Sequence, residues 1–303
     1  MGHEETVYEA LGLAPGDERH WAFGTGFHDP LAGVDTTVPD GIDPSDLGQY
    51  CLMLGDDALV LAQRLTQWIT AAPELEEEVA LANIALDLLG QARLLLARAG
   101  SVGVLGRSRE KATASIPDED ALAYFRDADE FRSTALVAAP NGDFARTTVR
   151  LLAAATVRLA VFVRLRASRD QVLAAIAAKG VHELTYHRDH AARWVRRLGD
   201  GTEESHRRAQ DGVDVVWPLL GELFTPTDVE TRLTAAGVAV DPAVTRDEVT
   251  GVLTTVLERA TLRVPPWPAD EPPRGRSGRH GPDLAELLIG LQGLARAHPE
   301  ATW

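Results

Sequence analysis

The chain has 303 residues, of which 45% are hydrophobic but only 6% aromatic, so its core is expected to consist mainly of Ala, Leu and Val. Such a core suits close-packed helices better than an aromatic-rich β-sandwich. The 45 acidic and 30 basic residues give a formal net charge of −15. A surface of that sign repels phosphate backbones, which argues against nucleic-acid binding.

The composition also predicts a cytoplasmic protein without a membrane segment. No run approaches the ~18 apolar residues that a membrane span needs, and residues 1–20 lack the apolar core of a signal peptide. The single cysteine, Cys51, excludes an intramolecular disulfide and fits a reducing compartment. Because Cys51 lies among apolar residues, we expect it to fill the core rather than to act as a nucleophile.

The first part of the chain differs from the rest. Residues 1–43 are rich in Gly, Asp and Pro and show no sustained hydrophobic period. We predict an irregular N-terminal extension there, either docked on a neighbour or partly disordered. The remaining residues, 44–303, are predicted to form one helical domain.

Helical patterns follow one another from Pro44 onward. The first long helix is predicted from an N-cap at Ser45 to the residue before Pro73. The second covers residues 75–99, with acids in its first turn and Gly100 at its end. Further helices are predicted over 118–137, 144–167, 170–198, 203–223, 226–236, 245–260 and 282–297. Because no hairpin or repeat is evident, the fold class is predicted to be all-α.

Two long antiparallel helix pairs dominate this pattern, with a connecting segment between them. That order is typical of a ferritin-like four-helix bundle, here with additional C-terminal helices. In this class two helices each give one Glu to a pair of metal ions, and the other two each give a Glu-x-x-His motif. Residues three apart lie on one helix face, so the Glu and the His converge on a metal in the core.

The first two long helices supply few of these ligands. Asp56 and Asp57 are the acids available on the first helix, and Asp87 is the acid near the middle of the second. Gly90 stands three residues after Asp87, where the histidine is required, and glycine has no side chain to bind a metal.

The other two helices lack the pattern as well. The helix over 144–167 contains no acid, and its long polar side chains belong to arginines. The helix over 170–198 carries Glu183 but has Tyr186 in the histidine position, with His187 one place late. At most three of the required six ligands are therefore present, and we predict neither a metal site nor a catalytic residue in this chain.

Three interpretations of the remaining ligand-type residues stay open, one of which is a single structural or adventitious metal ion. Asp87, Glu183 and His187 are expected to be held by hydrogen bonds in the core or by an arginine of the acid-free helix. The alternative is a standalone di-metal oxidase or oxygenase that uses these three residues. A separate basic loop contains Arg274, Arg276 and Arg279 just before a predicted helix start, where an anion such as coenzyme A or an acidic patch of a partner can bind; otherwise this is a solvated loop.

Several long strings resemble a known family. They are GDDALVLAQRLTQW, APELEEEVALANIALDLLGQAR, PNGDFARTT, LRASRD and HELTYHRDHAARWVRRLGDGTEESHRR. In this order they are similar to the C subunits of bacterial phenylacetyl-CoA epoxidases, the ring 1,2-monooxygenases of aerobic phenylacetate catabolism. The resemblance runs from about residue 45 to the C-terminus and leaves out residues 1–43.

This resemblance implies a ferritin-like subunit that has lost its metal ligands. It implies a homologous A subunit that holds the di-iron centre, a small B subunit, and a reductase with flavin and an iron–sulfur cluster that takes electrons from NADPH. A cofactor-free structural subunit of a hetero-oligomer is therefore our leading hypothesis. The competing hypotheses are the standalone oxidase and a coenzyme A-binding module built on the basic loop.

Overall fold

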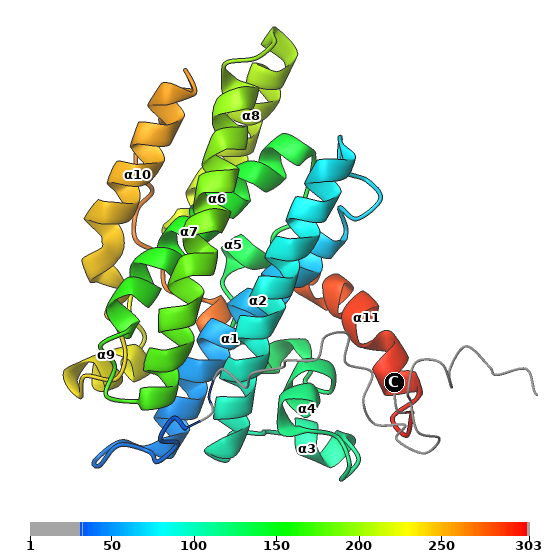
Figure 1. Cartoon of the computed structure of the whole chain (residues 1–303), viewed down its shortest axis with the longest axis vertical. Helices are drawn as coiled ribbons and strands as arrows, with labels where there is room; N and C mark the ends of the chain where they lie inside the picture. Colours follow the sequence, from blue (N-terminus) through cyan, green and yellow to red (C-terminus); the bar gives the residue numbers. More distant parts are fainter. Residues whose placement is uncertain (1–30, 32, 302–303) are drawn as a thin grey trace, which may run out of the picture. The chain divides into compact units, whose positions relative to one another are not determined.

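The computed structural model describes residue 31 and residues 33–301. Most of the predicted N-terminal extension, residues 1–30 and 32, therefore lies outside the described residues. The four long helices are α1 (Pro44–Thr66), α2 (Leu75–Ser101), α6 (Phe144–Leu165) and α7 (Gln171–Gly199). α1 packs along α2, α6 packs along α7, and α2 contacts α7, so that the two pairs form one bundle (Figure 1). The predicted all-α, ferritin-like architecture is confirmed.

The first helix starts and ends differently from its prediction. Asp43, not Ser45, is the N-cap: its carboxylate accepts a hydrogen bond from the Ser45 backbone N–H at 2.8 Å, and Pro44 occupies the first turn. α1 ends at Thr66, well before Pro73, and the turn that follows contains Thr70 in the left-handed region (φ 74°). The proline therefore does not end this helix.

The predicted helix over 118–137 is wrong. It is replaced by α4 (Asp118–Tyr124), the 3₁₀ turn η1 (Ala128–Glu130) and α5 (Ala135–Ala138), and a short helix α3 (Ser108–Lys111) precedes them. The backbone N–H groups of residues 132, 134 and 135 donate to carboxylates of other elements, namely Asp56, Asp57 and Glu222. These long-range bonds replace the intrahelical ones, so the helix is interrupted.

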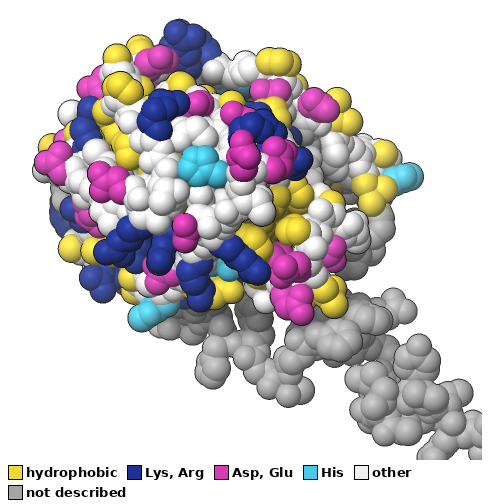
Figure 2. All heavy atoms as spheres, turned by 90° about the horizontal axis from the view of Figure 1, so that it is seen from above, with side chains coloured by type: hydrophobic (Ala, Val, Ile, Leu, Met, Phe, Trp, Pro, Cys, Tyr) yellow, Lys and Arg dark blue, Asp and Glu magenta, His cyan; other side chains and the backbone are white. Residues whose placement is uncertain are grey.

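The C-terminal part follows its prediction more closely. Its elements are α8 (Glu203–Val216), η2 (Trp217–Leu220), α9 (Asp228–Ala235), η3 (Pro242–Thr245), α10 (Arg246–Arg259), η4 (Gly275–Ser277) and α11 (Pro282–Ala297). The predicted helix over 203–223 ends early at Val216, because Pro218 lacks a backbone N–H and the chain tightens into η2. On the end face of the bundle, basic, acidic and hydrophobic side chains are interspersed (Figure 2).

Helix α2 bears on the expectation that the chain has no membrane segment. Within the described part of the chain it is the one helix long and apolar enough to cross a membrane by length and composition alone. In the structure it packs against α1, α4 and α7, and 44% of its most apolar window is buried. Packing in the bundle accounts for the apolar inner face of α2 but leaves an apolar outer face.

Candidate functional site

The centre of the bundle contains an arginine, Arg158 of α6. Its Nε donates to Gln91 Oε1 of α2 at 2.8 Å, and its Nη1 donates to the backbone oxygen of Leu54 at 2.9 Å. Gln91 Nε2 in turn donates to Glu183 Oε2 of α7 at 2.8 Å. The guanidinium also lies 4.4 Å from the ring centre of Phe162. A cation and an amide thus connect all four long helices.

Asp87 of α2 and His187 of α7, two residues of the kind that bind metals, contact each other between the same two helices. His187 Nε2 lies 3.0 Å from Asp87 Oδ2, and the imidazole is fully buried. Burial lowers the pKa of His187 despite the neighbouring carboxylate, which favours the neutral ring. The expected core hydrogen bonds of Asp87, Glu183 and His187 are therefore present. By contrast, the Tyr186 side chain is exposed, so it does not lie among them.

A second histidine–carboxylate contact lies further along α7. His190 Nε2 and Glu77 Oε2 of α2 are 3.1 Å apart, although their geometry is not that of a hydrogen bond. Burial lowers the pKa of His190, against the effect of Glu77. Both imidazoles on this face of α7 are thus buried beside acids of α2 and favoured in the neutral form.

The remaining acid of the predicted metal slots, Asp57, is bound by Arg276. Arg276 Nη2 donates to Asp57 Oδ2 at 2.7 Å, and its Nη1 donates to the backbone oxygens of Met53 and Arg132, each at 2.7 Å. The other carboxylate oxygen of Asp57 accepts from the Thr134 N–H at 2.8 Å. This is a correction: Arg276 was expected with Arg274 and Arg279 as a contact for coenzyme A or a partner, but its side chain is largely buried.

Two glycines bring the Arg276 loop into the core. At Gly275 an added Cβ would lie 2.0 Å from the backbone oxygen of Ser133, so only glycine allows this approach. Gly278 has φ 78° and ends the 3₁₀ turn η4 in the left-handed region. The sequence predicted a basic loop but gave no signal for this contact.

A cavity of about 70 Å³ adjoins Arg158 and Arg276. Most of its walls are apolar, and its polar lining residues are Tyr50, Asp57, Thr134, Arg158, Glu222, Thr225, Glu230 and Arg276. Two buried polar atoms of the lining, Arg158 Nη2 and Thr225 Oγ1, have no hydrogen-bond partner among the described residues. Burial raises the pKa of Glu222. The volume accommodates a few water molecules, which can satisfy such atoms.

These residues do not fit a pair of metal ions. A di-metal centre needs about four carboxylates to neutralise its charge and two histidines. Here the guanidinium of Arg158 is connected to Glu183 by hydrogen bonds through Gln91. The guanidinium of Arg276 is bound directly to Asp57. Burial lowers the pKa of Arg158 only to about 10, so it remains a cation at neutral pH and repels a metal. Gly90 cannot supply the missing ligand.

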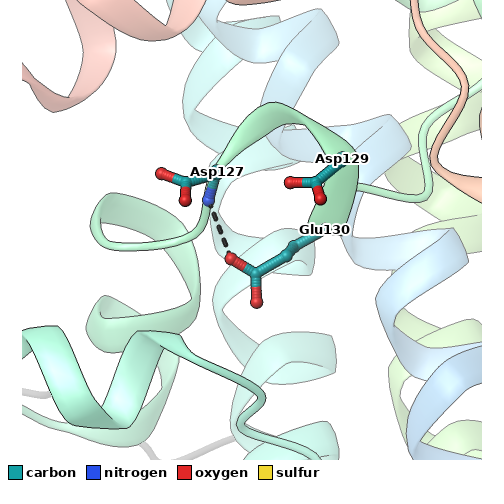
Figure 3. A group of neighbouring side chains, drawn as sticks. All are labelled: Asp127, Asp129 and Glu130. Atoms are coloured by element: carbon teal, nitrogen blue, oxygen red, sulfur yellow. Dashed lines mark hydrogen bonds between the residues drawn. The ribbon is translucent and has the colours of Figure 1, made fainter.

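Outside the bundle, three acids lie close enough together to resemble a metal site. Asp127, Asp129 and Glu130 form the one such group found in the described part of the chain (Figure 3). Glu130 Oε2 accepts from the Asp127 backbone N–H at 3.0 Å, which caps η1. Basic side chains already neutralise the group: Arg107 contacts Asp129 and Glu130, and Lys111 and Arg296 contact Asp127.

The other two arginines of the basic loop line an open groove. Arg274 and Arg279 are exposed beside a groove of about 770 Å³ at the start of α11. Acidic residues, including Glu222, Glu271 and Asp283, line the same groove, so its charge is mixed. Cys51, finally, is buried, and burial raises the pKa of its thiol, which suits a core residue.

The sequence predicted that Asp87, Glu183 and His187 are held by hydrogen bonds in the core, but it did not identify the two residues at the centre of these contacts. Gln91 and Arg158 form the central contact. The sequence indicated an arginine of the acid-free helix as a partner of the core acids but did not identify which one, and it did not indicate Gln91. The partner of Arg158 could not be read from the sequence, because several arginines occur on the same acid-free helix.

Comparisons with known proteins show what the chain is similar to. A family model described as phenylacetic acid catabolic protein matches residues 36–303. The chain is 39% identical over 259 residues to the C subunit of the 1,2-phenylacetyl-CoA epoxidase of Escherichia coli K12. That alignment covers 86% of this chain and the full length of the relative.

Proposed function

Because the chain belongs to the phenylacetic acid catabolic protein family, we propose that it is a non-catalytic, structural subunit of a multicomponent phenylacetyl-CoA epoxidase. In this role it pairs with a homologous di-iron catalytic subunit in the cytoplasm and stabilises it. The Escherichia coli relative is itself a subunit of such an enzyme, and the alignment spans it entirely.

The observation that carries this proposal is the position of Arg158. Its guanidinium lies between α2, α6 and α7 and is hydrogen-bonded to Gln91, which binds Glu183. A permanent cation at this point serves to hold helices together and opposes metal binding. The chain keeps the bundle of an oxygenase subunit and fills its centre with an arginine.

The proposal extends to cofactors and partners. This chain carries no cofactor of its own, the di-iron centre belongs to the catalytic A subunit, and flavin and an iron–sulfur cluster belong to the reductase. A small B subunit is the remaining member of the hetero-oligomer. The chain contributes surface area and stability rather than chemistry, as wide helical faces do in permanent complexes.

The central test compares the catalytic subunit produced with and without this chain. We expect the catalytic subunit alone to be poorly soluble or inactive, and the pair to turn over phenylacetyl-CoA when the remaining components are supplied. Full activity without this chain would contradict the structural role.

A second arm separates this role from a standalone oxidase. The double variant Asp87→Asn, Glu183→Gln removes two carboxylates that such an oxidase requires, and a catalytic role predicts that epoxidation is lost. The structural role predicts activity within about twofold of wild type, provided that the thermal unfolding of the variant confirms a folded chain.

The groove beside Arg274 and Arg279 supports a separate, testable contact with the coenzyme A part of the substrate. An Arg274→Ala, Arg279→Ala variant of the complex should then raise the KM for phenylacetyl-CoA and leave kcat unchanged. An unchanged KM would exclude this contact. Arg276 is kept in this variant because it is bound inside the bundle.

A further inference from the structure

The cavity beside Arg158 and Arg276 is lined by hydrogen-bond donors that have no acceptor in the described part of the chain. Arg158 is only 9% exposed, and its Nη2 has no partner there, nor has Thr225 Oγ1. The Tyr50 hydroxyl accepts from the Val240 N–H at 3.3 Å, but no described residue accepts its proton. Burial raises the pKa of Tyr50, so the phenol keeps that proton. Three segments of the chain therefore present unused donors to one cavity, and buried donors of this kind call for an acceptor.

The charge of Arg158 is not matched by a direct ion pair. Among the described residues no acid contacts its guanidinium, since Asp57 is bound by Arg276, and Glu183 is connected only through Gln91. Burial lowers the pKa of Arg158 to about 10, so the group is a cation at neutral pH. An anion at hydrogen-bond distance stabilises such a buried cation. Water accepts a hydrogen bond but supplies no charge.

The size and lining of the cavity define the kind of anion. Its volume is about 70 Å³, about half that of a cavity that holds benzene, so about four non-hydrogen atoms fit. The apolar lining includes Leu54, Leu61, Val157 and Val161. An inorganic ion has no apolar surface to place against these residues. A carboxylate with one methyl group has both a charged end and an apolar end.

We propose that this cavity binds one short aliphatic carboxylate of the size of acetate. Its oxygens accept hydrogen bonds from Arg158, Tyr50 and Thr225, and its methyl group packs against the apolar lining. The bound carboxylate is a counterion of Arg158 inside the bundle and undergoes no reaction there. The inference does not depend on the proposed function, because it concerns the isolated chain.

Three acids, Asp57, Glu222 and Glu230, also line the cavity. Each already accepts hydrogen bonds from the protein: from a guanidinium and a threonine for Asp57, from a backbone N–H for Glu222, and from a threonine for Glu230. Burial also raises the pKa of Glu222, which favours its neutral form. The protein thus supplies donors for its own acids and leaves those of Arg158 to the ligand.

A single layer of chain separates the cavity from the open groove at the start of α11. Thr134 lines the cavity, and the next residue, Ala135, lines the groove. Pro273 and Pro272 alternate in the same way, and Glu222 lines both spaces. The carboxylate therefore enters from the groove, between these segments, where two exposed arginines attract anions.

The first experiment measures the binding of radiolabelled acetate to the purified full chain by equilibrium dialysis in chloride-free buffer. We expect one acetate per chain, with a dissociation constant of about 1 mM or lower. Acetamide has the size of acetate but no charge, and benzoate is too large for the cavity. Each should displace acetate at least about tenfold less well than unlabelled acetate does.

The second experiment tests the donors. Arg158→Met and Tyr50→Phe should each raise the dissociation constant of acetate at least about tenfold, because each removes a hydrogen bond to a charged group. Tyr124→Phe changes a half-buried tyrosine that does not line this cavity, and it should bind acetate like the wild type. Thermal unfolding without acetate shows whether each variant is folded. Tyr50→Phe keeps the aromatic ring and decides the question if Arg158→Met does not fold.

The proposal is overturned if the wild type binds no acetate at about 10 mM, well above the expected dissociation constant; the cavity then holds water only. It is also overturned if the folded variants bind acetate as tightly as the wild type, or if benzoate binds as tightly as acetate. Either result would place the acetate outside the cavity. None of these outcomes bears on whether the chain stabilises the catalytic subunit, so this inference and the proposed function can fail separately.

Discussion

Two groups of acids were compared with a metal site, those of the bundle core for their positions in the sequence and those at η1 for their proximity in the structure, and the two groups are neutralised in different ways. In the bundle core, Asp57 and Glu183 lie beside the buried guanidinium groups of Arg276 and Arg158, the second acting through Gln91. At η1, the Asp127 cluster lies near the surface and is surrounded by Arg107, Lys111 and Arg296. The residue types in the two groups are similar. Removing one partner, however, lowers the free energy of unfolding more in the core than at the surface.

The difference shows that carboxylates alone do not define a metal centre. What decides is whether a cation of the protein already occupies the position that an ion would take. In the core this cation is held at low dielectric, and its loss leaves a buried charge unpaired. At the surface, water and salt replace a lost partner at little cost.

Breaking a buried pair next to the core should have the largest effect. Asp56 and Arg126 form an ion pair in which both side chains are almost completely buried, and Asp56 also accepts from the Arg132 N–H at 2.7 Å. Asp56→Asn leaves the Arg126 charge uncompensated and should lower the free energy of unfolding by about 3–5 kcal/mol. Urea unfolding measures this, and a loss below about 1 kcal/mol would contradict the account of the core.

Removing the central cation should cost less. Arg158→Met keeps the apolar stem but leaves Gln91 Oε1 and the Leu54 carbonyl without their donor. We expect the free energy of unfolding to fall by about 1–3 kcal/mol. Arg164→Met, an exposed-side substitution on the same helix, is the matched control and should change it by less than about 1 kcal/mol. Equal decreases in the free energy of unfolding for both variants would show that the hydrogen bonds of Arg158 do not stabilise the bundle.

The two buried histidines make stability depend on pH. Burial lowers the pKa of His187 and of His190, so the native state keeps both neutral while the unfolded chain takes up protons near the ordinary value of 6.5. The free energy of unfolding should therefore be highest above about pH 6.5 and should fall below it, by at most about 1.4 kcal/mol per pH unit for each histidine.

The variant His187→Gln tests the origin of this slope. It should flatten the fall in unfolding free energy below about pH 6.5, whereas His182→Gln, at an exposed position of α7, should keep the wild-type profile. The sign is decisive here: stability that increased on acidification would mean that His187 is charged in the native state and paired with Asp87.

The surface cluster should give the smallest effect. Asp129→Asn removes the exposed ion pair with Arg107, and we expect the free energy of unfolding to change by less than about 1 kcal/mol. The same experiment in about 0.5 M salt should show no measurable difference from wild type. A loss comparable to that of Asp56→Asn would erase the contrast between the two groups of acids.

The sequence predicted what depends on local pattern. Helix α11 was predicted with its observed bounds, and α2, α6 and α7 within two residues, because hydrophobic period, first-turn acids and glycines act over short distances. The helix predicted over 118–137 is interrupted because backbone N–H groups of this segment donate to carboxylates of distant segments, such as Asp56 and Glu222. No local pattern reports such bonds.

The candidate site shows the same limit. The loss of ligands at Gly90 and Tyr186 is visible in the sequence, because the spacing of a metal motif is local. The choice of Arg158 and Arg276 as the buried cations is not, since it depends on which loop reaches the core past Gly275. Three arginines of one loop looked equivalent until the fold separated Arg276 from the other two.

The most direct test of the central claim is the metal content of the purified chain after incubation with ferrous iron under anaerobic conditions and removal of unbound metal. The account predicts well below one iron per chain, because Arg158 and Arg276 occupy the core beside its acids. Two irons per chain would contradict it and would identify this protein as an enzyme in its own right.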